Sequence, residues 1–340
     1  MEENEIIQTT TVSGYKIVCA KLGCIMCVFY FGRIINGLLA DPIAGLIDRI
    51  GYWATYVTHT AVAIIFSYII PLFVTAILFK AFDNYKGKLR ILYKKPKKLA
   101  RALGSFPALY GLGYGTAILT LLVSFLISKA SGGQTFVEEL FRPTTIEPST
   151  DIAGALTIVF LMVVVAPIFE EFIVRGIMYD AIKPYGCGMA IIISSILFGL
   201  MHGRLFMLFY TTALGFALGY VRYATNSLLV TTILHAIINS FSAGMLLLLS
   251  LVEISGGEHK LINTIYGIYI IAIIILIIVG IIAFIRKIPM IRKYKIENSW
   301  TEISPGKKTG VFFLSIPVII MLIFAFNEHS NNWLLGLLIN

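Results

Sequence analysis

Charged residues are scarce in this chain. Asp, Glu, Lys and Arg together make up 13% of its 340 residues, while 58% of the residues are hydrophobic. The mean hydropathy is +0.88. This balance is typical of a protein that crosses a membrane several times. We therefore predict an all-α fold, a polytopic bundle of transmembrane helices located in the cell membrane.

The first residues contain no basic side chain, and cysteines are few in the whole chain. The chain begins Met1-Glu2-Glu3, without the basic segment and small-residue cleavage site of a secretory signal, so the first helix is expected to be retained. There are four cysteines. Cys24 and Cys27 have the spacing of a zinc-ligand pair, but a second pair is missing, so we expect them to pack in a helix. No disulfide framework is predicted.

Long apolar runs are abundant, and nine of them are read as membrane helices. They cover residues 17–39, 53–79, 102–127, 152–174, 187–203, 205–221, 227–251, 262–285 and 311–326. They form an N-terminal membrane region of three helices (1–128) with a basic loop (80–101), four central helices (152–251), and a C-terminal membrane region of two helices (252–340).

The basic residues are concentrated in two loops between these helices. Nine Lys and Arg lie between Lys80 and Arg101, and seven lie between Arg286 and Lys308. Cytoplasmic loops carry such an excess, so we predict that both loops and the amino terminus are cytoplasmic. Six predicted helices separate the loops, and an even number returns the chain to the same side. The net charge of +9 is thus attributed to topology and to contact with anionic lipid, and no nucleic-acid partner is predicted.

The most informative segment is Glu170-Glu171-x-x-x-Arg175, at the end of the apolar run that begins at residue 152. Ionisable residues inside a membrane span are costly and usually mark function. Glu171 and Arg175 are four residues apart and share a helix face, whereas Glu170 is rotated about 100° from Glu171. One carboxylate can therefore pair with Arg175 while the other points elsewhere.

Two later helices carry polar side chains at a comparable depth. His202 follows the turn near Gly186 by roughly 15 residues, and Glu171 precedes that turn by a similar length of helix. His235 and Asn239 lie four residues apart on one face of the helix 227–251. Carboxylates, two imidazoles and a carboxamide are thus expected to meet at one buried point.

Each of these groups alone has an ordinary structural explanation. A single membrane histidine is more often a hydrogen-bonded packing residue than a catalyst, and Glu171 and Arg175 could form an ion pair within one helix. Their combination favours a functional site. Ser194 and Ser195 lie about two turns before His202, so no covalent nucleophile is expected.

Three motifs occur in order: Glu-Glu-x-x-x-Arg at 170–175, Phe-x-x-x-His at 198–202 and His-x-x-x-Asn at 235–239. Together they resemble the CAAX protease and bacteriocin-processing family, also called the Abi or type II CAAX prenyl endopeptidase family. The resemblance covers about residues 152–246. It implies an intramembrane endopeptidase whose helices form a conical cavity, where a peptide is hydrolysed beside the membrane.

The same resemblance implies a role for each motif. Glu170 would be the general base, which with His202 holds and deprotonates the attacking water. His235 and Asn239 would stabilise the oxyanion, and the Glu-Arg pair would orient the site. The chemistry agrees, because a carboxylate kept from bulk water is a stronger base, and a neutral amide offers donors without adding a charge.

The residues leave metal dependence open, with a metal-free mechanism favoured. If zinc is bound, Glu170, His202 and His235 are the predicted ligands, a His-His-Glu set. Two non-enzymatic alternatives remain: a bacteriocin-immunity or peptide-binding membrane protein, and a secondary transporter, which would usually show inverted repeats. The expected substrate is a peptide or a membrane protein, and nothing in the sequence identifies a prenyl group.

Overall fold

A computed structural model describes residues 11–47, 51–80, 93–96, 99–130, 148–203, 205–293 and 303–329. In these residues every regular element is a helix. The prediction of an all-α fold is therefore confirmed.

The helices follow the predicted apolar runs. The first are α2 (Val12–Ile47), the continuous run α3 (Tyr52–Ile64), η2 (Ile65–Ile69) and α4 (Ile70–Leu78), then α7 (Leu99–Leu103) and α8 (Phe106–Ala130). A second continuous run contains α10 (Ile152–Phe160), η3 (Leu161–Val165), α11 (Ala166–Glu171), η4 (Phe172–Met178), α12 (Tyr179–Ile182) and η5 (Lys183–Tyr185). The others are α13 (Cys187–Leu200), α14 (Leu205–Thr225), α15 (Leu228–Ile254), α16 (Lys260–Lys293), α17 (Pro305–Phe313) and α18 (Ile316–His329). Each predicted run corresponds to one of these helices or to consecutive ones.

Six helical stretches in the described residues can cross a membrane by length and composition. They are Val12–Ile47, Ala54–Leu78, Leu99–Ala130, Ile152–Tyr185, Leu228–Ile254 and Lys260–Pro289. α17 and α18 pass the same test together but are bent by 66°. α13 has 14 residues, or about 21 Å, which is shorter than the hydrocarbon core of about 30 Å. The protein is thus a multi-pass membrane protein, with six or seven candidate spans among the nine predicted runs.

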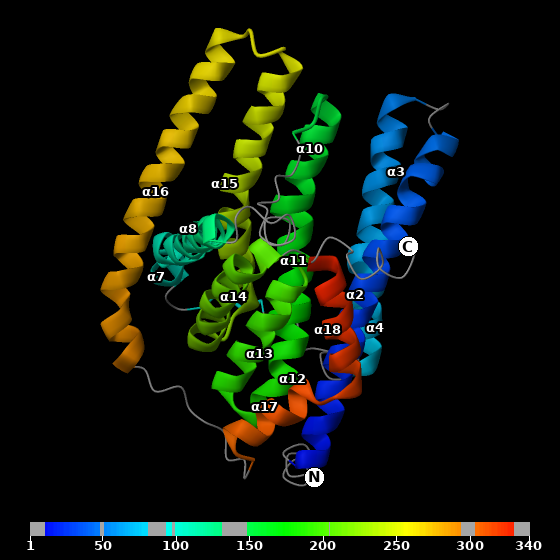
Figure 1. Ribbon diagram of the computed structural model, residues 1–340, viewed down its shortest axis with the longest axis vertical. Helices are drawn as coiled ribbons and strands as arrows, with labels where there is room; N and C mark the ends of the chain where they lie inside the picture. Colours follow the sequence, from blue (N-terminus) through cyan, green and yellow to red (C-terminus); the bar gives the residue numbers. More distant parts are fainter. Residues whose placement is uncertain are drawn as a thin grey trace.

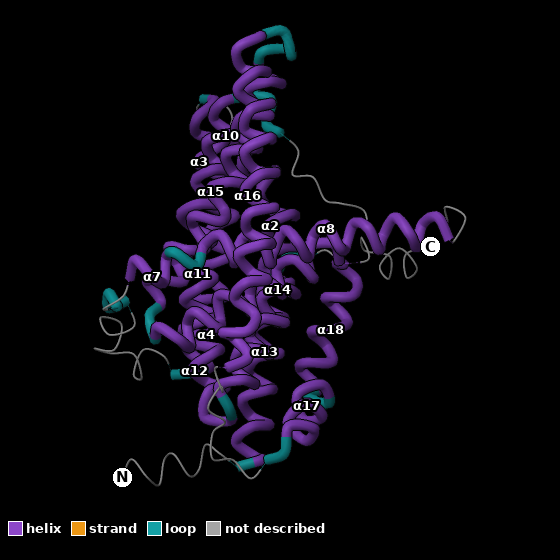
Figure 2. Tube along the Cα trace, turned by 90° about the vertical axis from the view of Figure 1, so that its left-hand side faces the viewer, coloured by secondary structure: helices purple, strands orange, loops and turns teal. Residues whose placement is uncertain are grey.

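Most helices run along the long axis of the molecule, and α8 lies crosswise to them. Figure 1 views α8 along its axis, and Figure 2 shows it lengthwise, pointing away from α16. α8 packs against both α14 and α16, α2 packs against α3 and α18, and α10 packs against α15. The largest buried cluster joins α2, α13 and α18 and includes Leu22, Phe198 and Met321. Segments far apart in the sequence therefore share one core.

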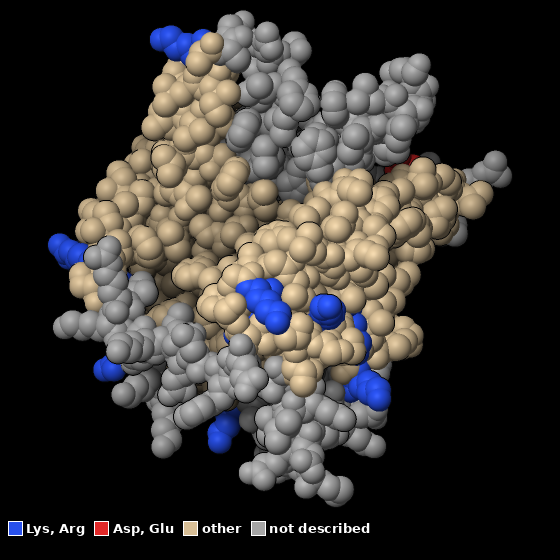
Figure 3. Space-filling model, turned by 60° about the horizontal axis from the view of Figure 1, so that its bottom comes forward, with Lys and Arg blue, Asp and Glu red and all other residues tan. Residues whose placement is uncertain are grey.

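The two basic loops begin at the same end of the molecule. α4 and α16 both run toward the lower end in Figure 1, where α2 begins. Figure 3 shows that Lys and Arg side chains are spread over this end, where hardly any Asp or Glu is visible. This agrees with the prediction that both loops share one side of the membrane. Residues 81–92, 97–98 and 294–302 of these loops lie outside the described residues, and which side is cytoplasmic stays a prediction.

A π-helical segment precedes each of two prolines. Pro71 is the second residue after η2, and Pro167 is the second residue after η3. In a π-helix the N–H of residue i+5 bonds to the carbonyl of residue i, as Ala166 does to Leu161. The next donor would come from position 167, but proline has no N–H. The carbonyl of Met162 is therefore left for a side-chain donor.

Candidate active site

Glu171 is the tightly held member of the carboxylate pair. Its side chain is fully buried, and its Oε1 lies 3.0 Å from both Arg175 Nη1 and His235 Nδ1. The ion pair expected from the four-residue spacing is thus present. A carboxylate only accepts hydrogen bonds, so His235 Nδ1 carries the proton. Because His235 belongs to α15, Glu171 also ties α15 to the α11–η4 run.

Arg175 is fully buried and has partners on three other elements. Its Nη2 donates to the carbonyl of Gly215 on α14 at 3.2 Å, and its guanidinium carbon lies 4.1 Å from the ring centroid of Phe198 on α13. A Cβ at Gly215 would lie 3.3 Å from Arg175 Nη2 and 3.1 Å from Phe198, so the glycine permits this close packing. A buried cation with these contacts holds Glu171 in one orientation.

Glu170 approaches His235 from its other ring nitrogen. Its Oε2 is 3.9 Å from His235 Nε2, beyond hydrogen-bond distance, and its side chain is 12% exposed. Within the described residues this Oε2 is buried without a hydrogen-bond partner, as is Glu171 Oε2. Buried acceptors are normally paired, so Glu170 can accept a hydrogen bond or a proton from a bound molecule. As predicted, only one of the two carboxylates pairs with Arg175.

His202 lies in the turn after α13. Its Nδ1 is 2.8 Å from the carbonyl oxygen of Phe198. A carbonyl can only accept, so Nδ1 carries the proton, and Nε2 of the neutral ring is an acceptor. The Phe198 ring packs edge-on against His202 and His235, at centroid distances of 4.9 and 5.6 Å. Phe198 therefore contacts both imidazoles, and His202 and His235 share this ring.

Two α2 side chains that the motif analysis missed hold this turn. Tyr30 Oη donates to the carbonyl of Leu200 at 2.9 Å, and Arg33 Nη1 donates to the carbonyl of Met201 at 2.7 Å. The last carbonyls of a helix lack donors within the helix, so α2 supplies them for α13. Arg33 did have a signal in the sequence, because a charge within an apolar run usually marks function.

Arg222 on α14 fixes the backbone beside the ion pair. It is 2% exposed, and its Nε donates to the carbonyl of Arg175 at 3.2 Å. Its other nitrogens donate to Asp180 at 3.2 Å and to Asn226 at 2.6 Å. The main chain and the side chain of Arg175 are therefore both anchored to α14. Sequence spacing could not indicate this contact, because it depends on how α14 packs.

Tyr68 of η2 is a further residue near the carboxylates. Its ring lies 5.6 Å from that of Phe169, measured between centroids, and Phe169 directly precedes Glu170 in the chain. The helical run α3–η2–α4 thus contributes to the surroundings of Glu170, although Tyr68 belongs to none of the three motifs.

Asn239 lies one turn after His235 on α15. Its Nδ2 donates to the carbonyl of Met162 at 2.9 Å, the carbonyl for which Pro167 provides no backbone donor. An amide nitrogen carries two hydrogens, so the second N–H of Asn239 can serve another acceptor. The π-helical segment η3 therefore orients this side chain.

The predicted zinc ligands do not form a metal site in this arrangement. Within the described part of the chain, no group of three or more His, Cys, Asp or Glu side chains could hold a metal ion. His235 Nδ1 contacts Glu171, and His235 Nε2 lies 3.9 Å from Glu170. His202 directs its Nδ1 at a carbonyl. In the described part of the structure, Glu170, His202 and His235 are therefore not brought together as a metal-binding group.

Comparisons with known proteins agree with the motifs. Residues 152–241 match the family described as "Type II CAAX prenyl endopeptidase Rce1-like". The chain is also similar to a protein of Bacillus subtilis (strain 168) named "Putative membrane peptidase YdiL", with 30% identity over 137 residues. The aligned part covers 37% of this chain and 55% of that protein, or about half its length. No solved structure gives a significant match.

All six predicted site residues fall inside the matched segment, which runs from the start of α10 into α15. The motif resemblance, the family match and the similarity to the Bacillus subtilis protein agree. Residues 152–241 of this chain are thus similar to the type II CAAX prenyl endopeptidases, and part of the chain is similar to a putative membrane peptidase.

Proposed function

We propose that this chain is an intramembrane endopeptidase that hydrolyses a peptide bond beside the membrane with water activated by Glu170. The observation that carries the proposal is the unequal pair of carboxylates. Glu171 is bound by Arg175 and His235, whereas Glu170 Oε2 is a buried acceptor without a partner in the described residues. A base in such a position can take a proton from water. The substrate is a peptide or another membrane protein.

His202 assists Glu170 by orienting the water. Its Nδ1 hydrogen bonds to the Phe198 carbonyl, which leaves Nε2 as the acceptor in the neutral ring. A water that donates one O–H to Glu170 and the other to His202 directs a lone pair at the peptide carbonyl. Two fixed acceptors thus set the direction of attack.

His235 and Asn239 stabilise the oxyanion. Asn239 has a second N–H beyond the one given to Met162. His235, whose Nδ1 is held by Glu171, can donate through Nε2 when its ring is an imidazolium. Each preorganised donor of this kind typically contributes about 3 to 4 kcal/mol to lowering the barrier. Glu171 and Arg175 keep the imidazole in place.

The reaction proceeds in two steps, the addition of water and the collapse of the tetrahedral intermediate. Glu170 removes a proton from water, the water oxygen bonds to the carbonyl carbon, and the carbonyl π electrons move to the oxygen that becomes the oxyanion. When the oxyanion collapses, the carbon–nitrogen bond breaks and Glu170 returns the proton to the leaving amine. One water is consumed, and no covalent enzyme intermediate is formed.

A proteomic comparison of new peptide termini tests the proposal. Membranes carrying the native chain are compared with membranes carrying Glu170→Gln, His202→Ala or Asn239→Ala. Each variant is expected to reduce product termini at least about 100-fold. Glu253→Gln and His259→Ala, at exposed positions on or after α15, are the matched controls and should leave cleavage unchanged. Near-native cleavage by Glu170→Gln would remove Glu170 as the base.

The same samples distinguish the alternatives. If native and Glu170→Gln proteins give the same termini but both co-purify with the same peptides, the chain is a peptide-binding or immunity protein. Inactivation by a chelator that zinc reverses would instead establish a metal enzyme. Intact folding of each variant is checked by its elution profile and unfolding temperature in detergent.

A further inference from the structure

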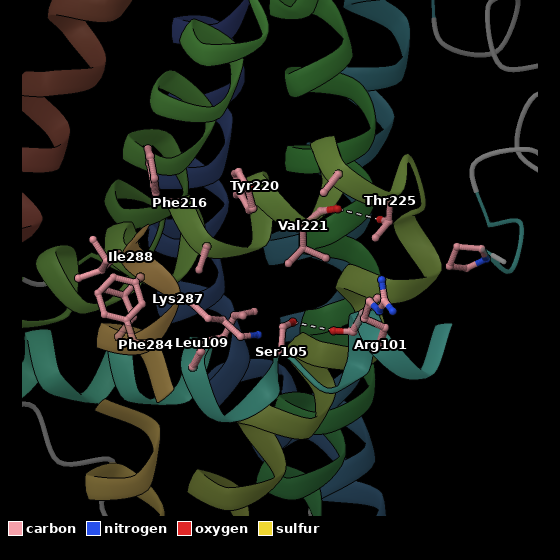
Figure 4. Close-up of a pocket in the computed structure, with 17 residues that line it drawn as sticks. Arg101, Ser105, Leu109, Phe216, Tyr220, Val221, Thr225, Phe284, Lys287 and Ile288 are labelled. Atoms are coloured by element: carbon pink, nitrogen blue, oxygen red, sulfur yellow. Dashed lines mark hydrogen bonds between the residues drawn. The ribbon is translucent and has the colours of Figure 1, made fainter. Parts of the chain in front are cut away.

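A cavity of about 900 Å³ lies between α7, the start of α8, α14 and α16. Figure 4 shows residues from these helices that surround it. Its volume is in the range of sites that bind small molecules, about 300 to 1,000 Å³. None of the six candidate catalytic residues lines it. The cavity is therefore separate from the proposed active site.

Each helix contributes a single face to the cavity. The α14 residues follow a helical repeat from Ala213 through Ala217 and Val221 to Ala224, and the α16 residues Phe284, Lys287 and Ile288 follow the same spacing. Most of these side chains are apolar. The lining is thus suited to a hydrocarbon chain.

Close contact between α8 and α16 accounts for the position of the cavity. A Cβ at Gly111 would lie 1.9 Å from the backbone carbon of Gly280, so the two helices touch where neither has a side chain. Phe284 and Lys287 lie one and two turns beyond Gly280 on α16. The cavity opens beside this crossing, where α14 packs on α8.

The charges in the lining have one sign. Among the described lining residues, Arg101 and Lys287 are the charged ones, and neither Asp nor Glu is present. The hydroxyl of Ser105, in the turn after α7, donates to the carbonyl of Ala102 at 2.6 Å, and that of Thr225 donates to the carbonyl of Val221 at 2.7 Å, so they add little polarity (Figure 4). Arg101 is exposed and Lys287 is half-buried. Such side chains can cover apolar surface with their stems while the charges remain near water.

Arg101 and Lys287 also belong to different basic loops of the sequence, 80–101 and 286–308. The cavity thus joins two segments that both carry positive charge. Basic pockets between membrane helices on the cytoplasmic side bind anionic lipid head groups. The surrounding bilayer supplies such a ligand at high local concentration.

We propose that this cavity binds an anionic phospholipid of the bilayer, with an acyl chain between α14 and α16 and the phosphate paired with Arg101 and Lys287. The guanidinium of Arg101 matches phosphate oxygens with two donors, and Lys287 adds a second positive charge. This is a lipid site in addition to the proposed peptidase site.

Binding is measured with a fluorescent phosphatidic acid added to the purified full-length protein in detergent. The double variant Arg101→Gln/Lys287→Gln is expected to weaken binding about 10- to 30-fold. The control Lys260→Gln/Arg286→Gln removes the same net charge at exposed α16 positions outside the lining and should bind like the native protein. Ala217→Phe, which fills the cavity with a ring, should also weaken binding.

Three outcomes would overturn the proposal. Equal losses in the double variant and its control would mean that overall charge attracts the lipid. Equal binding of a labelled phosphatidylcholine would remove the anionic requirement. Displacement by oleate but not by unlabelled phosphatidic acid would identify a fatty-acid site. If a variant has a lowered unfolding temperature, native mass spectrometry of lipids retained by its folded fraction gives the same comparison.

Discussion

Glu170 and Glu171 are neighbours in the chain with different surroundings. Glu171 bonds to Arg175 and His235 in a fully buried position. Glu170 lies at the edge of the cluster and pairs with neither Arg175 nor a hydrogen-bond donor in the described residues. A buried charge pair costs desolvation, and removing one partner leaves the other unpaired. The two glutamates should therefore differ in what their loss does to the protein.

We expect Glu171→Gln to destabilise the protein and Glu170→Gln to leave its stability nearly unchanged. Loss of the Glu171 charge leaves Arg175 buried without its counter-ion, which costs about 3 to 5 kcal/mol. Unfolding temperatures in detergent provide the measurement, with the exposed Glu253→Gln as control. Equal unfolding temperatures for Glu171→Gln and Glu170→Gln would contradict the assignment of Glu171 as the structural carboxylate.

Arg33 should act on catalysis through His202. It donates to the Met201 carbonyl beside this histidine, so Arg33→Gln is expected to lower kcat about tenfold with little change in KM. Arg33→Lys keeps a donor and should recover part of the rate. Lys16→Gln, an exposed change on the same helix, is the control. A Lys variant as slow as the Gln variant, with a lowered unfolding temperature in both, would indicate a purely structural role.

At the level of helices, Pro167 explains why the Met162 carbonyl of η3 has no backbone donor. Without an N–H at this position, the Met162 carbonyl accepts from Asn239 instead. π-helical segments are frequent at functional sites. Here η3 orients Asn239, η4 carries Arg175, and η2 carries Tyr68. Three irregular segments, in two continuous helical runs, thus contribute residues around the carboxylates.

Pro167→Ala tests this role of the irregular helix. The new N–H would compete with Asn239 for the Met162 carbonyl, so cleavage should fall about tenfold while the unfolding temperature stays equal or rises. Pro42→Ala, inside α2, is the matched control for removing a helix proline. Unchanged cleavage by Pro167→Ala would show that the proline does not set the position of Asn239.

At the scale of the whole molecule, the prediction concerns the membrane topology, that is, the side on which each loop lies. Four of the six candidate spans, Leu99–Ala130, Ile152–Tyr185, Leu228–Ile254 and Lys260–Pro289, lie between the two basic loops. This number is even, as was the predicted six. Because α8, which forms most of Leu99–Ala130, lies crosswise to the other helices, the shared lower end of α4 and α16 in Figure 1 is the stronger indication that the loops lie on one side. The turn at Gly257 follows three of these spans and should face the other side.

Reporter fusions check this arrangement. Fusions at Pro96 and Pro305 should both report the cytoplasm, because the basic residues around them favour that side. A fusion at Gly257 should report the opposite face. Opposite locations for Pro96 and Pro305 would require an odd number of crossings between them and would overturn the topology.

Relations within one helix could be predicted because helical spacing is set by the chain itself. The apolar runs predicted the helices, the spacing of Glu171 and Arg175 predicted their ion pair, and His235 and Asn239 were placed on one face. Relations between helices depend on packing angles and depths that no local spacing contains. Only the tertiary structure decided that His235 binds Glu171, that Arg33 of α2 holds the turn of His202, and that Arg101 and Lys287 share a cavity.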